Sequence, residues 1–134
     1  MALDVTAHRE ADRWPTGCEG THGFPRVDRD GTHVLASCAK SGKVTLLDAG
    51  DGHQVGAYEV GGGESLPAYS AERNRFYVRS DPGNTLAVLQ ASPEGLEEVR
   101  TVQVPETGHC LGANGEHYWT CDADAGSVLL VADQ

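Results

Sequence analysis

The run Gly42–Leu47 (GKVTLL) returns twice at a fixed distance along the chain, which indicates a repeat protein. Its copies are Asn84–Leu89 (NTLAVL) and Gly126–Val131 (GSVLLV), each 42 positions after the one before (84 − 42 = 42; 126 − 84 = 42). The runs are apolar and β-branched, as in buried strands. A period of about 40–45 residues with strand-like runs is typical of a β-propeller blade.

A second run keeps the same spacing. His33–Ser37 (HVLAS) is followed by Arg75–Arg79 (RFYVR) and by His117–Cys121 (HYWTC). The dipeptide Phe24-Pro25 likewise has its counterpart at Leu66-Pro67. Because separate runs share one offset, the sequence predicts an all-β propeller with three blades rather than three chance similarities.

Each repeat predicts four short strands, A to D, separated by turns rich in Gly, Asp and Asn. We expect a single half-propeller domain over residues 1–134, with blades at about 18–60, 61–104 and 105–131. The third repeat stops after strand C. Trp14-Pro15 resembles Val104-Pro105, which follows a strand D, so residues 5–14 are predicted to be the closing strand D of the last blade.

The runs Phe76–Ser80 and Gly42–Asp48, the latter followed by Asp51-Gly52, resemble the bacterial YVTN-repeat propellers. Those propellers are related to surface-layer repeats and to the haem-d1 propeller of nitrite reductase. The resemblance covers the chain from about Trp14 to Asp133 and implies the fold, whereas propellers carry many functions. This chain departs from the family in length, since family rings usually have about seven blades.

Three blades cannot close a ring, because propellers need roughly 4–8. An open half-ring would leave two blade faces uncovered. We therefore expect a head-to-tail homodimer with six blades, in which the N-terminal strand of one copy completes the last blade of the other. The alternative is that the chain is a fragment of a longer propeller.

Composition excludes several partners. The chain has 20 acidic and 10 basic residues and a net charge of −10, so it lacks the basic surface that nucleic acids and anionic membranes require. Residues Met1–Val5 have no signal-peptide pattern, and no window is long and apolar enough for a membrane span. The four cysteines are thus expected to be thiols and the protein to be cytoplasmic.

Strand direction predicts where the polar residues gather. Because strands alternate in direction, the D–A and B–C loops lie at one end of the blades, whereas the A–B and C–D loops lie at the other. The first end is expected to bind a small ligand or a protein segment, through residues Glu19, His22, Glu64, Arg79 and His109. The opposite end receives His33, His53 and His117.

The same end also holds candidate metal ligands. Cys18, His22, His109 and Cys110 precede innermost strands, and Cys and His are ligands of zinc and other soft transition metals. No ligand set is complete by spacing, and buried cysteines often only pack. A binding scaffold is therefore the first hypothesis. The alternative is a small metal-dependent lyase or hydrolase that uses His22 and His109; the catalytic residues and the ligand are not identified by the sequence.

Overall fold

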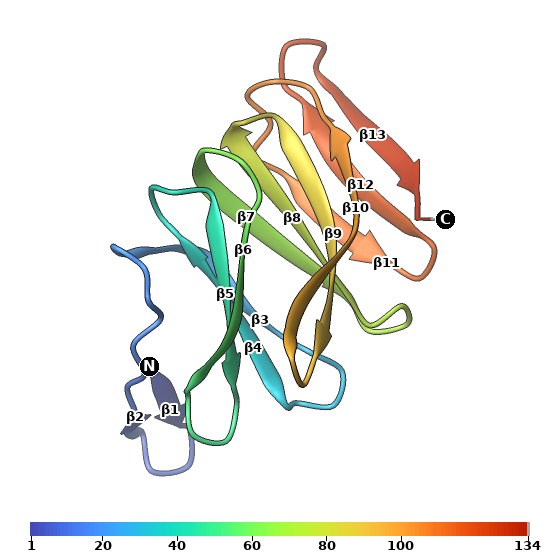
Figure 1. Cartoon of the computed structure of the whole chain (residues 1–134). Helices are drawn as coiled ribbons and strands as arrows, with labels where there is room; N and C mark the ends of the chain where they lie inside the picture. Colours follow the sequence, from blue (N-terminus) through green and yellow to red (C-terminus); the bar gives the residue numbers. More distant parts are fainter. Residues whose placement is uncertain (134) are drawn as a thin grey trace.

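A computed structural model describes residues 1–133, and their strands form a row of twisted antiparallel sheets (Figure 1). The first blade contains β3 (Thr21–Val27), β4 (His33–Cys38), β5 (Lys43–Asp48) and β6 (Gln54–Glu59). The second contains β7 (Gly63–Ser70), β8 (Arg75–Pro82), β9 (Thr85–Ser92) and β10 (Gly95–Gln103). The third contains β11 (Leu111–Asn114), β12 (His117–Asp122) and β13 (Ser127–Ala132). Within the described residues, no helix is long and apolar enough to cross a membrane.

The predicted fold class is confirmed. The first two blades are four-stranded with neighbouring strands in chain order, and the third has three strands, as the truncated repeat predicts. The strands of the first two sheets lie inside residues 18–60 and 61–104, and those of the third end at Ala132, one residue beyond the expected limit of 131. The outer edge of β13 pairs with no other strand among residues 1–133.

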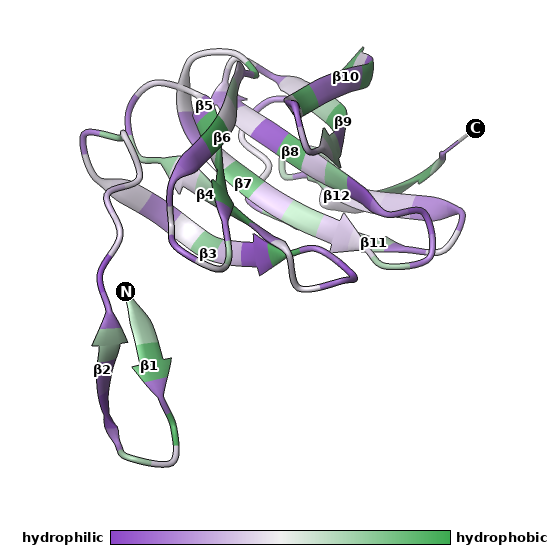
Figure 2. Ribbon diagram, turned by 60° about the horizontal axis from the view of Figure 1, so that its bottom comes forward, coloured by the Kyte–Doolittle hydropathy of each residue, from purple (hydrophilic) through white to green (hydrophobic). Residues whose placement is uncertain are grey.

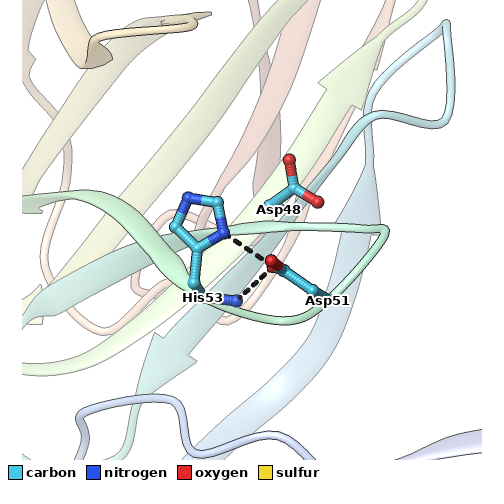
Figure 3. Close-up of side chains that lie close together, drawn as sticks. All are labelled: Asp48, Asp51 and His53. Carbon is cyan, nitrogen blue, oxygen red and sulfur yellow. Dashed lines mark hydrogen bonds and ion pairs between the residues drawn. The ribbon is translucent and has the colours of Figure 1, made fainter.

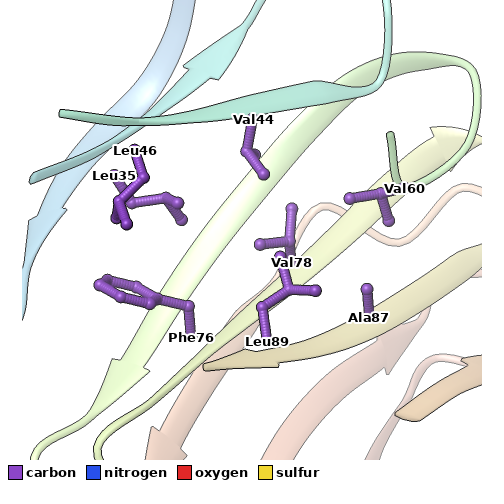
Figure 4. Packing of buried hydrophobic residues seen from close by; sticks show 8 residues of the cluster. All are labelled: Leu35, Val44, Leu46, Val60, Phe76, Val78, Ala87 and Leu89. Atoms are coloured by element: carbon purple, nitrogen blue, oxygen red, sulfur yellow. The ribbon is translucent and has the colours of Figure 1, made fainter. Parts of the chain in front are cut away.

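The blades are held together by apolar side chains that alternate along strands B and C. Between the first and second blades, Leu35, Val44 and Leu46 pack against Phe76 and Leu89, and all five are fully buried (Figure 4). Side chains one position along each strand face the other way. The middle strands of the second blade are therefore apolar on both faces, since this blade has a neighbouring blade on each side.

The second contact, between the second and third blades, follows the same rule. Tyr77, Leu86 and Val88 pack with Tyr118, and the rings of Tyr77 and Tyr118 lie 5.2 Å apart. Polar bonds reinforce this contact at its far end. Asp133 is 2% exposed and accepts hydrogen bonds from the Tyr77 hydroxyl (2.5 Å) and from Arg75 Nη1 (2.8 Å).

The N-terminal segment differs from the expected single strand over residues 5–14. Residues 5–8 form a turn, and β2 (Arg9–Asp12) pairs with β1 (Ala2–Asp4) in a hairpin that stands away from the blades (Figure 2). The turn is set locally, because Asp4 Oδ1 accepts hydrogen bonds from the amides of Thr6 (3.0 Å) and Ala7 (2.9 Å). We call residues 1–13 the arm. Within one chain, the arm does not complete the third blade.

The A–B turn of the first blade is organised by Asp28. Its carboxylate accepts hydrogen bonds from the amides of Thr32 (2.8 Å) and His33 (3.1 Å) and from the Thr32 hydroxyl (2.8 Å), and His33 Nδ1 lies 2.8 Å away. Burial alone would raise the pKa of Asp28, but the hydrogen bonds from His33 and Thr32 outweigh it and hold the pKa below its usual value.

We expect Asp28→Asn to lower the free energy of unfolding by about 1–3 kcal/mol at pH 7, because an amide cannot accept all of these bonds. The contribution of an aspartate with a lowered pKa is complete above about pH 4 and is lost as the pH falls through its folded-state pKa. The difference between wild type and variant should therefore shrink in acid. Urea unfolding at pH 7 and pH 3 measures both effects. Asp30→Asn, whose side chain is 71% exposed, is the control and should change little. Equal losses in the two variants would contradict this role for Asp28.

Candidate functional site

The candidate site lies at the end of the blades formed by the D–A and B–C loops. There, a small cavity of about 10 Å³, room for a single water, is lined by residues from all three blades. They include His22 from β3, Glu64 from β7, Arg79 and Asp81 from β8, and His109 from the segment before β11. Four of the five predicted ligand-binding residues are thus brought together; their role in binding stays a prediction.

Two imidazole–carboxylate pairs cross the boundaries between blades. His22 Nε2 lies 3.3 Å from Glu64 Oε2, joining the first blade to the second. His109 Nε2 lies 3.9 Å from Asp81 Oδ2, joining the third blade to the second. The His109 side chain is 70% exposed, whereas Asp81 is 15% exposed. These pairs offer acceptors and exchangeable donors to a ligand that approaches from solvent.

Arg79 is 1% exposed, so its side chain does not lie where it could contact a ligand directly. Its Nη1 donates to the Thr120 hydroxyl (2.5 Å) and to the Cys121 carbonyl (3.1 Å), and its Nη2 donates to the Pro105 carbonyl. Arg79 Nε and Asp81 Oδ1 are buried without a hydrogen-bond partner. Arg79 therefore braces the second blade against the third and leaves one donor beside the cavity.

Gly108 makes room for this brace. A Cβ at this position would overlap the Cys121 carbonyl and the guanidinium of Arg79. A side chain here would have to displace a buried cation, so glycine is required by the close approach.

A shallow depression of about 480 Å³ continues from the cavity and shares Glu64, Asp81 and His109 with it. Its other lining residues are Gly63, Pro82, Asn84 and Thr107. The volume is in the range of small-ligand sites. Asn84 and Thr107 were not predicted as site residues, although their places in the B–C and D–A loops follow from the repeat.

The structure corrects the expectation of free thiols. Cys18 is bonded to Cys38 and Cys110 to Cys121, with Cα–Cα distances of 5.1 and 5.5 Å. Each disulfide joins the segment before strand A to the end of strand B of one blade. Because disulfide sulfurs are not thiolates, Cys18 and Cys110 are not available as metal ligands in this structure. The sequence held a signal for this pairing, since antiparallel A and B strands place these positions side by side.

Glu19 is exposed and lines neither the cavity nor the depression. The predicted metal set is not assembled either: His22 and His109 pair with different acids. Among residues 1–133, one group of three ligating residues has ligand atoms within 4.8 Å of one another, namely Asp48, Asp51 and His53 (Figure 3). This group belongs to the C–D turn of the first blade, at the opposite end from the site.

Hydrogen bonding within the turn accounts for that group. Asp48 Oδ1 accepts from the Gly50 amide (2.7 Å), and Asp51 Oδ1 accepts from the His53 amide (2.9 Å) and lies 2.6 Å from His53 Nδ1. The bonds from the His53 backbone and side chain lower the pKa of Asp51, and the bond to Asp51 raises the pKa of His53. The residues shape a turn, as Asp does in many loops.

No protein-family model and no curated protein sequence matches the chain. Solved structures are similar in fold. Dihydro-heme d1 dehydrogenase NirN in complex with DHE has a TM-score of 0.68 at 18% identity, over 97% of this chain and 32% of that one. The RRP9 WD40 repeats give 0.69 at 11%, over 97% and 43%. Hydrazine synthase of Kuenenia stuttgartiensis gives 0.62 at 13%, over 94% and 39%.

These identities support the fold alone. The chain spans between about a third and under a half of the length of the three structures. Together with the row of four-stranded sheets, the comparisons define the class: the chain is a partial β-propeller. The resemblance to YVTN-type propellers is supported at the level of the propeller fold.

We expect Arg79→Met to lower the free energy of unfolding by about 1–3 kcal/mol, because it leaves buried carbonyl acceptors at the second contact without donors. Arg29→Met is the control, since the Arg29 side chain is 52% exposed. Thermal and urea unfolding measure the difference. An Arg79→Met variant as stable as wild type would show that this brace contributes nothing.

The disulfides make a separate prediction. Protein unfolded in guanidinium without reductant should show no free thiol on titration with Ellman's reagent. The double variant Cys18→Ala/Cys38→Ala should lose about 2–4 kcal/mol of stability, because the cross-link no longer restricts the unfolded chain. Four titratable thiols per chain would contradict both disulfides.

Proposed function

We propose that this chain is a ligand-binding propeller scaffold that works as a head-to-tail homodimer. The observation that carries the proposal is the convergence of His22, Glu64, Asp81 and His109, from three blades, around one cavity and its open depression. Strands and disulfide-linked segments hold these side chains, so the site is pre-organised.

The ligand is a small polar molecule or a protein segment that donates hydrogen bonds. Glu64 and Asp81 present carboxylate acceptors to the depression, and Asn84 adds an amide. His109 is the most exposed of the charged or titratable groups that line the cavity and its depression, and would contact a ligand first. Buried Arg79 acts as a positioning residue, because it holds the second blade and the segment before β11 together.

The homodimer is supported by the exposed apolar face of the third blade and by the hollow on the first blade. Val128 and Leu130 on β13 are 65% and 58% exposed, and β13 has an open edge. In the sequence, the arm stands where a strand D stands in the repeats, immediately before the segment that leads to the next strand A, β3. A second copy would cover these faces and receive the arm along β13, giving six blades.

The cytoplasmic location was expected from reduced thiols. Two disulfides favour an oxidising compartment instead, because cytosolic reductants keep most cysteines reduced. Determination of the thiol state in freshly lysed native cells, with thiols blocked before lysis, distinguishes the two locations.

Binding is tested by NMR of ¹⁵N-labelled protein against soluble fragments that each carry an amine, an amide or a guanidine. We expect shifted amide signals to cluster at residues 63–64, 81–84 and 107–109. His109→Ala and Glu64→Gln should weaken binding at least about 10-fold, the effect of losing one hydrogen bond to a charged group.

His53→Ala, at the opposite end, is the matched control and should bind as wild type does. Fragment shifts that gather elsewhere, or unchanged affinity in both site variants, would overturn the proposed site. A zinc titration belongs to the same series. Zinc-dependent shifts centred on His22 and His109 would favour the metal-dependent lyase or hydrolase over the binding scaffold.

A further inference from the structure

The two contacts between blades inside the chain show which strand positions one blade uses to pack against the next. In the first contact, Leu35, Val44 and Leu46 of the first blade face the second. Forty-two positions later, Tyr77, Leu86 and Val88 of the second blade face the third. The same strand positions thus make the forward-facing surface of each blade.

One more repeat leads to the forward face of the third blade. The positions 42 residues after Tyr77, Leu86 and Val88 are Trp119, Val128 and Leu130. Val128 and Leu130 are 65% and 58% exposed, whereas their counterparts in the first two blades are fully buried. The third blade therefore carries the apolar side chains of one half of a contact, with no blade packed against them among residues 1–133.

The other half is present on the backward face of the first blade. In the first contact the second blade supplies Phe76, Val78 and Leu89, with Tyr69 packed beside them. Forty-two positions earlier, the first blade has Val34, Ala36 and Leu47, with Val27 in the place of Tyr69. These four residues line a hollow of about 450 Å³.

Trp14 supports the same assignment. Val60 and Val104 follow the outermost strands β6 and β10, and they pack in the first and second contacts respectively. Trp14 follows β2 in the same way and lines the hollow on the first blade. Its ring lies against Gly52, where a Cβ would overlap it, so the indole is held at this face. Trp14 thus holds the place of Val60 and Val104 in a third contact.

We infer that Trp119, Val128 and Leu130 of one copy pack into the hollow lined by Val27, Val34 and Leu47 of a second copy, in the register of the contacts inside the chain. The inference rests on the proposed homodimer and names the two surfaces that make it. The partner is a second copy because both complementary halves of one repeated contact are present on a single chain. Two such contacts close a six-blade ring and place β2 of each copy along β13 of the other.

The test uses two residues that are exposed in the single chain, so that charge at either one is tolerated by the monomer. Val27 is 51% exposed and lies in the hollow, and Leu130 lies on the forward face of the third blade. Wild type should give twice the 14.2 kDa of one chain by light scattering after size exclusion. Val27→Glu and Leu130→Glu should each raise the dimer dissociation constant at least about 100-fold, because a carboxylate would be buried unpaired.

Val99→Glu is the matched control. Val99 is 41% exposed on the outermost strand β10 of the second blade, and this variant should remain dimeric. Circular dichroism and thermal unfolding check that all three variants keep the fold.

Mixing the two face variants identifies the head-to-tail arrangement. Val27→Glu keeps a normal third blade and Leu130→Glu keeps a normal first blade, so an equimolar mixture should form a two-chain species through one intact contact. Analytical ultracentrifugation with one variant fluorescently labelled detects it. A wild-type monomer would overturn both the homodimer and this inference. If the wild type is a dimer and at least one of the two substitutions leaves its dissociation constant unchanged, this inference is overturned and the homodimer stands. Fragment binding at His109 is read independently of both.

Discussion

The side chains along the middle strands alternate between the two faces of each sheet, so that a sheet can pack against a neighbour on either side. In strand β9, Leu86 and Val88 face the third blade, whereas Ala87 and Leu89 face the first. A sheet built in this way is stable only when it is covered on both sides, because each face is apolar. The second blade satisfies this condition within the chain. The first and third blades each have one face against which no other four- or three-stranded sheet packs among residues 1–133.

The two disulfides lie in the outer blades of the row. They occur in the first and third blades, each of which has a single neighbour, and tie strand A to strand B there. The second blade has no cysteine and is held instead by Arg79 and by the contacts on its two faces. His22 and His109 follow or precede a cross-linked cysteine closely in the chain, and Asp81 lies two residues after Arg79 on β8. Fold stability and site geometry therefore share one set of covalent and hydrogen-bonded supports.

Much of the fold could be predicted from the sequence, because the repeat fixes both strand order and strand direction. The repeat predicts that the third blade lacks a fourth strand, and that His22, Glu64 and His109 lie at the same end of the blades. The arm was less predictable, since a local turn at Asp4 pairs β2 with β1 when no partner edge is near. The burial of Arg79 depends on carbonyls of the third blade that no spacing pattern indicates. The cysteine pairing follows from the antiparallel strands A and B, which place Cys18 beside Cys38 and Cys110 beside Cys121, whereas composition alone indicates thiols.

A scaffold of this kind separates its two tasks. Alternating residues within the strands make the contacts between blades, whereas residues at one end of the strands and in the adjoining loops make the site. Small-angle X-ray scattering of the purified protein in solution measures directly whether two chains close a ring. A head-to-tail homodimer should give the distance distribution of a closed, disc-shaped particle built from two chains. A scattering curve that fits one open wedge of three blades at every concentration would contradict it.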